Sequence, residues 1–237
     1  MCGRFAMLVP PAKMPLIYGI EDEPDFPPRY NIAPTQPILV VLEEQAHRIS
    51  RLMRWGFVPG WVKNPRDFPL LVNARGESVA DKPAFRDALN HGRCIVPASG
   101  YYEWRAGPDK RRQPHFISLA NGEPMALAAL CSTWTGPDGE EVDTVATITV
   151  AANVDLAPIH HRMPAILPPE AIDDWLDVKQ VRAAEALTLL RPLPAGAVRF
   201  HPVSMRVNSA DFDDADLLRP VTPEMPVVAL PAQLDLF

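Results

Sequence analysis

The sequence predicts a single α+β domain in which helices flank a core rich in β-strands. Short apolar runs recur along the chain, and turn residues such as Asn121-Gly122 and Asp138-Gly139 separate them at a spacing typical of antiparallel pairing. No internal repeat and no long low-complexity linker divides the chain before residue 206. With 237 residues, the chain is also long enough to bury a sizeable core.

The first quarter of the chain is expected to begin with a short helix and to continue with two strands. The apolar run from Ile38 to Leu42 is typical of a buried strand, and the arginine-bearing run that follows it ends in Trp55-Gly56-Phe57. Proline and acidic residues before these runs favour loops. The expected elements are a helix over 10–19 interrupted by Pro15, a loop over 21–29, a polar turn over 29–35, and strands over 38–42 and 47–57.

The rest of the chain alternates strand-like and helical patterns. Residues 70–77 form an apolar run that ends in an amide and a guanidinium, Asn73 and Arg75. Pro83 stands where a helix start tolerates proline, so a helix is expected to run to Asn90. The other expected elements are strands over 100–104, 115–120, 125–134, 143–152 and 198–204, one or two helical turns over 153–159, and helices over 168–176 and 180–190.

Composition argues against several classes of protein. No run reaches the ~18 apolar residues that a membrane helix needs, and no signal peptide is recognisable. Cys2, Cys94 and Cys131 are an odd number without CxxC spacing, which argues against a disulfide framework or a zinc site. We therefore expect a cytoplasmic protein from a reducing compartment.

The charge is distributed unevenly, although its net value of −6 at first argues against nucleic acid. Residues 1–120 hold 16 Lys and Arg against 12 Asp and Glu, whereas residues 121–237 hold 7 against 17. This asymmetry permits a local basic groove on an acidic protein. A solvated charged surface with no ligand explains the counts equally well.

Cys2 is the first residue with a chemical interpretation. If Met1 is removed, Cys2 carries a free α-amine and a thiol on adjacent carbons, with ordinary pKa values near ~8 and ~8.5. An aldehyde can form an imine with the amine, and the thiolate can then close a five-membered thiazolidine ring. The alternative is that Cys2 is a small buried hydrophobic residue without a chemical role.

Two further segments hold candidate acid–base groups. Glu103 is flanked by Tyr102 and Trp104, and apolar surroundings would raise its pKa into the range useful for proton transfer. The pair His160-His161 follows the predicted helical turns, where neighbouring residues point about 100° apart, so only one of the two can face a given site. The alternatives to an acid–base role are that Glu103 is an exposed charge at the end of a strand and that the histidine has a purely structural role.

Taken together and in this order, the motifs resemble the SOS-response-associated peptidase (SRAP) family, whose members crosslink to abasic sites in DNA. The segments that carry the resemblance are MCGRF (1–5), RYNIAPTQ (29–36), WGFVPGW (55–61), NARGES (73–78), RCIVPASGYYEW (93–104), IHHRMPAIL (159–167) and HPVS (201–204) with Val207-Asn208. The family often has Asp after the first histidine of its motif, where this chain has His161. This difference affects local hydrogen bonding and could make His161 a second titrating group.

The resemblance implies a fold and a chemistry. The fold would be one domain over 2–218 with mixed, mostly antiparallel sheets and a barrel-like core. The α-amine of Cys2 would attack the aldehyde of an abasic deoxyribose, and its thiol would close the thiazolidine, a crosslink that shields the lesion. Glu103 would act as general acid and base, His160 would assist opening of the sugar, and Asn73 would position the sugar or the N-terminus. No metal or organic cofactor is needed.

The resemblance also implies a DNA partner, single-stranded or at a junction with duplex, so the protein would be nucleoid-associated during repair. Arg4 and Arg75 fit phosphate or sugar contacts, Trp61 could stack on a base, and Arg162 is a further candidate for DNA binding.

The tail, residues 219–237, is expected to be flexible because it is rich in proline and unpatterned. It ends in QLDLF, which resembles the peptide by which bacterial replication and repair proteins dock on the sliding clamp. The anchors would be Gln233, Leu234, Leu236 and Phe237. The alternative is that this hydrophobic terminus packs on its own domain.

Two other functions remain open from the sequence. A cysteine peptidase limited to autoprocessing would use Cys2, His160 and Glu103 as nucleophile, base and orienting group. A noncatalytic reader of modified or single-stranded DNA would use only the basic, aromatic-rich half. Blocking the α-amine of Cys2 separates the crosslinker from both, since a cysteine peptidase needs only its thiol and a reader needs neither group.

Overall fold

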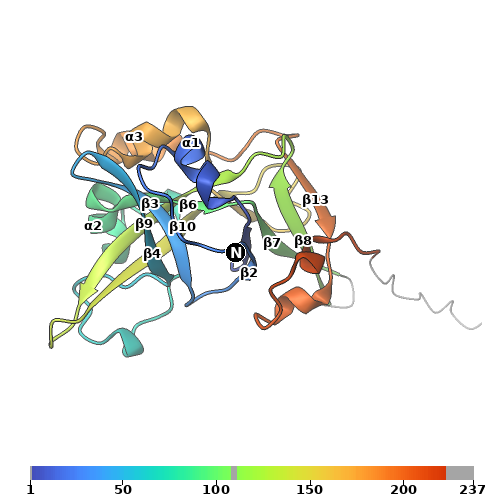
Figure 1. The fold of residues 1–237 in the computed structure, drawn as a ribbon, viewed down its shortest axis with the longest axis horizontal. Coiled ribbons are helices and arrows are strands. Elements are labelled where there is room, and N and C mark those ends of the chain that lie inside the picture. Colours follow the sequence, from blue (N-terminus) through green and yellow to red (C-terminus); the bar gives the residue numbers. More distant parts are fainter. Residues whose placement is uncertain (1, 108–110, 223–237) are drawn as a thin grey trace, which may run out of the picture.

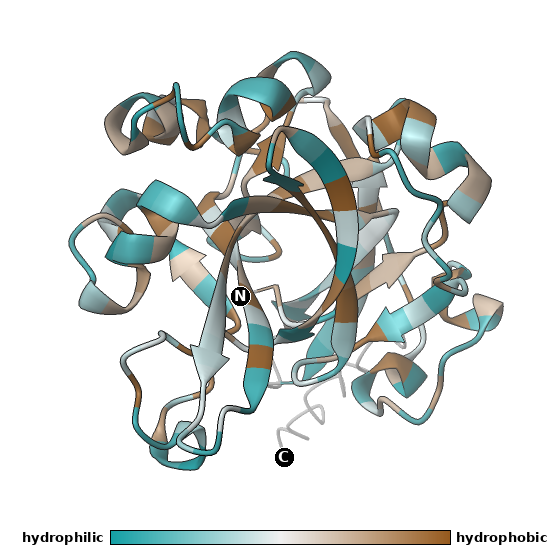
Figure 2. Cartoon of the chain, turned by 60° about the vertical axis from the view of Figure 1, so that its left-hand side comes forward, coloured by the Kyte–Doolittle hydropathy of each residue, from teal (hydrophilic) through white to brown (hydrophobic). Residues whose placement is uncertain are grey.

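The computed structural model describes residues 2–107 and 111–222. Its centre is a ring of five strands, each paired with two others of the set. Figure 2 shows these strands curving around a common axis. In ring order they are β4 (His47–Trp55), β3 (Pro37–Glu44), β6 (Arg93–Ala98), β9 (Met125–Thr135) and β10 (Glu141–Ala151). The predicted barrel-like core is therefore confirmed.

Four of the five neighbouring pairs in the ring are antiparallel, and β10 pairs with β4 in parallel. An odd number of strands cannot alternate direction all the way around a closed ring, so one parallel pair is required. The Asp138-Gly139 turn correctly predicts the hairpin of β9 and β10, but the pairing expected across Asn121-Gly122 is wrong, because residues 112–119 pair within a second sheet and not with β9. The closing parallel pair has no signal in the sequence. β5 (Asn73–Arg75) continues along the same edge of β10, also in parallel, and its register places Asn73 opposite Thr147.

A second sheet lies beside the barrel in the order β13 (Val198–Pro202), β8 (Arg112–Leu119), β7 (Gly100–Ala106), β1 (Phe5–Met7) and β2 (Arg29–Ile32). Figure 1 shows the two sheets side by side with the N-terminus between them. Within the second sheet, Gly100 permits the close approach of β7 and β8, because a Cβ there would lie 2.4 Å from the Phe116 ring and 2.6 Å from the carbonyl oxygen of Ile117. The second sheet thus holds the N-terminal strand against the barrel.

Two short strands complete the barrel sheet: β11 (Arg162–Pro164) pairs with the end of β10, and β12 (Ile166–Leu167) pairs with β9. Helices lie outside the strands (Figure 1). The α-helices are α1 (Met14–Tyr18), α2 (Pro83–His91), α3 (Ile172–Leu176) and α4 (Ala183–Ala186). The 3-10 turns are Pro11–Lys13, Pro65–Asp67, Gly76–Ser78, Pro169–Ala171, Leu187–Leu189, Met205–Asn208 and Ala215–Leu218. No helix in the described part of the chain is long and apolar enough to cross a membrane.

The segment after β13 folds back over the N-terminal strands. The Asn31 side-chain amide donates hydrogen bonds to the carbonyl oxygens of Ser209 and Phe212 at 2.9 and 2.7 Å. The Asp213 carboxylate accepts a hydrogen bond from the backbone N–H of Asn31 at 2.9 Å. Packing continues to Val221, whose N–H donates to the carbonyl oxygen of Pro202, so ordered contacts extend past residue 218. Residues 233–237, the predicted clamp-binding peptide, lie outside the described residues.

Several predicted elements differ from the structure. The polar turn expected over 29–35 begins as strand β2, because β1 supplies a pairing partner that the sequence pattern does not reveal. The strand expected over 70–77 is only three residues long. Residues 153–159 form the expected one or two helical turns without a regular helix: Ala157 and His160 donate backbone hydrogen bonds to residues four positions earlier, and the Asn153 side chain caps the first turn by accepting the N–H of Leu156. The helices expected over 10–19, 168–176 and 180–190 are each split into α and 3-10 pieces.

Candidate functional site

Cys2 lies just before β1, and its side chain is buried, with 1% of the residue exposed. Its Sγ lies 3.9 Å from the carbonyl oxygen of Arg4, which is within the range of a weak S–H hydrogen bond. Burial raises the pKa of the Cys2 thiol, and the nearby Glu103 carboxylate raises it further. The resting thiol is therefore protonated and needs a proton acceptor before it can act as a nucleophile.

Asn73 fixes the backbone of Cys2. Its Nδ2 donates a hydrogen bond of 2.8 Å to the Cys2 carbonyl oxygen, and its Oδ1 accepts one of 2.7 Å from the Thr147 hydroxyl. A hydroxyl that donates to Oδ1 leaves only the NH2 group to face Cys2, so the second contact determines the orientation of the amide. β10 supplies Thr147 and β5 supplies Asn73, through the parallel register described above.

Glu103 lies on β7 opposite His115, and it is buried. Burial raises the pKa of its carboxyl group, which is the environment expected from the flanking aromatics. The nearest histidine nitrogen is Nδ1 of His160, 3.8 Å from Oε1 of Glu103. A carboxyl group whose pKa is shifted toward neutrality, next to an imidazole, is equipped to exchange protons with a bound substrate.

The His160 ring is held by the backbone of the following turn. Its Nδ1 lies 3.0 Å from the Arg162 N–H, from which it accepts a hydrogen bond, and 3.2 Å from the Arg162 carbonyl oxygen. Burial lowers the pKa of His160, so the neutral ring predominates. The Arg162 N–H can donate only to an unprotonated Nδ1, and this contact assigns the proton of the neutral ring to Nε2. In that tautomer the Nε2–H is a hydrogen-bond donor.

Both adjacent histidines lie near Glu103: His160 approaches its carboxylate to 3.8 Å, and the charge of His161 contributes to lowering the pKa of Glu103. His161 is exposed, and its ring centroid lies 4.4 Å from that of His160. The proximity of His160 is the main cause of a lowered pKa for His161. A positive charge on either ring therefore disfavours a charge on the other.

The arginines predicted to bind DNA fall into two groups. Arg4 donates to Oδ1 of Asn31 at 2.9 Å and to the carbonyl oxygen of Val207 at 2.8 Å, which ties the N-terminal segment to the C-terminal one. Arg162 makes a bidentate ion pair with Glu77, at 2.7 and 2.8 Å. Both guanidinium groups are thus engaged within the fold, and a phosphate would compete with these partners.

Arg75 and Trp61 are more accessible than these two arginines. Arg75 is exposed at the end of β5, two residues after Asn73. Trp61 is 62% exposed and makes an edge contact with Phe68, with ring centroids 5.8 Å apart. An exposed indole supported from one side is suited to stacking on a base.

Two residues near the site were missed by sequence reasoning. Arg112, at the start of β8, lies close enough to His160 to contribute to the lowering of its pKa. Tyr101 is buried on the same face of β7 as Glu103, two residues away. The period-two alternation of a strand would have identified Tyr101, whereas Arg112 approaches His160 only through tertiary folding.

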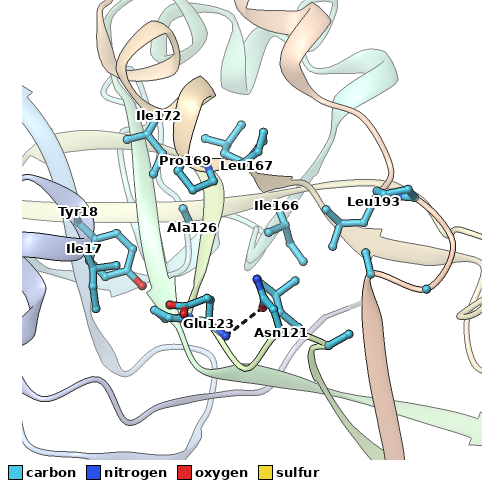
Figure 3. Close-up of a pocket in the computed structure, with 17 residues that line it drawn as sticks. Ile17, Tyr18, Asn121, Glu123, Ala126, Ile166, Leu167, Pro169, Ile172 and Leu193 are labelled. Atoms are coloured by element: carbon cyan, nitrogen blue, oxygen red, sulfur yellow. Dashed lines mark hydrogen bonds between the residues drawn. The ribbon is translucent and has the colours of Figure 1, made fainter.

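A separate apolar cavity of about 620 Å³ lies beside α1. Figure 3 shows Ile17 and Tyr18 of α1 lining it together with Ile166, Leu167 and Ile172. None of Cys2, Asn73, Glu103 and His160 lines this cavity, so it is not the candidate site. Within the described residues, no group of three or more His, Cys, Asp or Glu side chains could hold a metal ion.

Comparisons with known proteins agree with the motifs. The family model described as SOS response associated peptidase (SRAP) matches residues 1–210. The chain is 33% identical over 221 residues to the abasic site processing protein YoqW of Bacillus subtilis, covering 92% of this chain and 99% of that protein. It is 35% identical over 229 residues to the abasic site processing protein YedK of Escherichia coli, covering 93% and 100%.

The fold is also found among solved structures. An X-ray structure of a protein from Bacteroides thetaiotaomicron superposes with a TM-score of 0.84 at 24% identity, covering 93% of this chain and 100% of that one. Family model, relatives and fold agree over most of the chain. The chain belongs to the SOS response associated peptidase (SRAP) family.

Proposed function

We propose that the protein recognises abasic sites in single-stranded DNA and crosslinks to them through Cys2 after Met1 is removed. The observation that carries this proposal is the meeting of four side chains from distant segments, namely Cys2, Asn73, Glu103 and His160. The names of the relatives support the choice of substrate, since YoqW and YedK are abasic site processing proteins.

The chemistry proceeds in two stages on the ring-opened sugar. The α-amine of Cys2 adds to the C1′ aldehyde and gives a carbinolamine, whose hydroxyl takes a proton from Glu103 and leaves as water. Glu103, now a carboxylate, accepts the thiol proton of Cys2, and the sulfur adds to the iminium carbon. The balance is one aldehyde plus one aminothiol giving one thiazolidine and one water, without a cofactor. The raised pKa of Glu103 suits both transfers, because it lowers the cost of moving between the two forms near neutrality.

His160 and Asn73 assist these stages without forming bonds to the substrate. The Nε2–H of His160 donates to the sugar oxygen that becomes a hydroxyl when the ring opens. Asn73 holds the Cys2 carbonyl so that amine and thiol approach the same carbon. Such positioning reduces the entropy that the reaction must lose in its transition state.

DNA would reach this site along the more accessible basic and aromatic groups. Arg75 is placed for a phosphate contact next to Asn73, and Trp61 is placed for stacking. We assign Arg4 and Arg162 a supporting role, because their guanidinium groups already bind Val207 and Glu77. The proposal includes binding at junctions of single and double strands, where an unpaired sugar can enter the site.

A peptidase limited to its own N-terminus is the second candidate, since the family description contains that word. Cysteine peptidases rely on a thiolate whose pKa is lowered by a neighbouring histidine. Here burial raises the pKa of Cys2, and Nδ1 of His160 is occupied by the backbone of Arg162. Both observations favour the crosslinker.

We also propose that the tail recruits the protein to the sliding clamp through Gln233, Leu234, Leu236 and Phe237. Its support is the sequence QLDLF and the length of chain available after Thr222, the last described residue. The ten residues between Thr222 and Gln233 would span roughly 17 Å as a flexible tether, which is enough to keep the domain near a replication fork.

The function is tested by mixing the protein with single-stranded DNA that carries one abasic site, followed by denaturing gels and intact mass analysis. Wild-type protein should give a heat-stable adduct at Cys2 whose mass shows the loss of one water. Cys2→Ala should lose the thiazolidine, and a form that retains Met1 should give no adduct. Failure of correctly processed protein to form an adduct would leave the peptidase or the DNA reader.

A further inference from the structure

Tyr101 carries a buried hydroxyl whose role the fold does not explain. The residue is fully buried, and its hydroxyl has no hydrogen-bond partner in the described part of the chain. Two other buried tyrosines follow the usual pattern: the Tyr18 hydroxyl donates to the carbonyl oxygen of Met125, and that of Tyr102 donates to the carbonyl oxygen of Tyr30. An unpaired buried hydroxyl costs free energy that a phenylalanine would not, so its presence calls for a functional explanation.

The position of Tyr101 links it to the candidate site. Alternation along β7 places Tyr101 and Glu103 on one face and Tyr102 on the other. Across the β1–β7 pair, Tyr101 lies opposite Phe5, three residues after Cys2. Burial raises the pKa of Tyr101, and the next contributions come from Cys2 and Glu103, so these are its titratable neighbours. The phenol therefore stays protonated and remains a hydrogen-bond donor.

We propose that the Tyr101 hydroxyl donates a hydrogen bond to the sulfur of Cys2 when the thiol loses its proton during ring closure. The inference rests on the proposed thiazolidine chemistry. The thiol proton goes to the Glu103 carboxylate, the sulfur electron pair forms the bond to the iminium carbon, and the C=N π electrons return to nitrogen. Tyr101 keeps its proton throughout and stabilises only the transient negative charge on sulfur.

This role accounts for the unpaired hydroxyl at rest. The protonated Cys2 thiol donates to the carbonyl oxygen of Arg4, and neutral sulfur is a weak acceptor that gives Tyr101 little reason to bond. A thiolate in the same buried place is a strong acceptor, and hydrogen bonds to charged groups are among the stronger ones. The donor is thus in place before the charge appears, which is the general way in which enzymes stabilise transient anions.

The test compares Tyr101→Phe with Tyr102→Phe, a matched control on the opposite face. Tyr101→Phe removes an unsatisfied group, so we expect an unchanged or higher melting temperature together with thiazolidine formation slowed about tenfold. Tyr102→Phe breaks an existing bond of 2.7 Å to the Tyr30 carbonyl, so we expect a lower melting temperature and an unchanged rate.

Trapping with cyanoborohydride locates the affected step. In Tyr101→Phe the reducible imine should accumulate before the ring closes, because only the sulfur step is impaired. In a Cys2→Ala background, which can form only the imine, Tyr101→Phe should change nothing. Equal ring-closure rates for wild type and Tyr101→Phe, or an equal slowing of imine formation in the Cys2→Ala background, would overturn the assignment. Absence of any adduct from wild type would instead refute the proposed function itself.

Discussion

The hydroxyl of Thr147 donates a hydrogen bond to Oδ1 of Asn73 at 2.7 Å and thereby turns the amide NH2 toward the Cys2 carbonyl. Thr147 is buried in the centre of β10, so a rigid barrel strand determines the orientation of the Asn73 amide beside Cys2. The first prediction follows from this contact.

Thr147→Val should leave Asn73 free to rotate, and crosslinking should slow by about three- to tenfold, since the lost contact is worth about 1 kcal/mol. The measurement is the initial rate of adduct formation. Thr144→Val, another buried threonine of β10, should keep its rate because its hydroxyl bonds the backbone of Val58 instead. Equal rates for the two variants would show that the orientation of Asn73 does not matter.

Glu103→Gln should slow crosslinking by about 10²-fold or more, because an amide cannot carry the two proton transfers.

The same variant should change how the free energy of unfolding depends on pH. Burial raises the pKa of Glu103 in the folded protein above its ordinary value of 4.5, so the folded state holds a proton that the unfolded state has lost. The bound proton of Glu103 therefore stabilises the folded protein fully below pH 4.5, and this stabilisation is lost as the pH rises through the pKa that Glu103 has in the folded state.

Denaturant titrations of wild type and Glu103→Gln across this range test the sign. The variant should gain stability relative to wild type as pH increases from about 4 toward neutrality. A gain in the opposite direction would mean that Glu103 is stabilised as a carboxylate, and the assignment of its acid role would be withdrawn.

His160→Gln and His161→Gln should separate the two histidines. His160 is partly buried and lies 3.8 Å from Glu103, so its replacement should slow adduct formation by about tenfold or more, whereas the exposed His161 should be replaceable with a smaller effect. Burial lowers the pKa of His160, so its contribution to stability is lost as pH falls from its ordinary value of 6.5. His160→Gln should therefore lose less stability than wild type on acidification. Comparable losses of rate in His160→Gln and His161→Gln would contradict the different roles assigned to the two histidines.

Arg75→Ala and Arg162→Ala should differ in what they affect. Arg75→Ala should weaken binding of single-stranded DNA and reduce the slope of log affinity against log salt by about 0.7 for the lost phosphate contact. Arg162→Ala should chiefly lower stability, by about 1 to 2 kcal/mol, because it removes buried hydrogen bonds to Thr149 and the ion pair with Glu77. Salt-dependent binding curves and denaturant titrations on both variants provide the comparison. A reduced salt slope in Arg162→Ala would assign a phosphate to that residue too.

Deletion of residues 233–237 should abolish binding to a purified bacterial sliding clamp while leaving adduct formation unchanged. Substitution of Leu236 and Phe237 by alanine should have the same effect, since the anchors are proposed to be apolar. Equal clamp affinity with and without these residues would refute the recruitment role. A change in the melting temperature of the truncated protein would indicate instead that the tail packs on its own domain.

The sequence predicts the long strands well and the short ones badly. The β9–β10 hairpin has two long strands around the Asp138-Gly139 turn, and β3 begins with the apolar run from Ile38 to Leu42, so local pattern identifies these strands. β1 and β2 are three and four residues long and exist only because β1 pairs with β2 on one side and with β7 on the other. No local signal encodes such mutual pairing.

The same contrast between local sequence signals and contacts made only in the folded chain holds for the candidate site. Chemistry singles out Cys2, Glu103 and His160 in the sequence, but nothing local shows that Arg162 is engaged by Glu77 or Arg4 by Val207. These contacts join residues 85 and 203 positions apart, and only the folded chain brings them together.

The bond between Arg4 and Val207 also has a consequence for biosynthesis. Val207 lies 203 positions after Arg4, so the strand that follows Cys2 leaves the ribosome well before the segment that fixes it. At about 5 to 20 residues per second, roughly 10 to 40 seconds separate the two events. During that interval the contact of Arg4 with Val207 cannot form, so β1 lacks part of its final support. Under the proposed function, removal of Met1 would have this window before the segment around Cys2 is fixed in place.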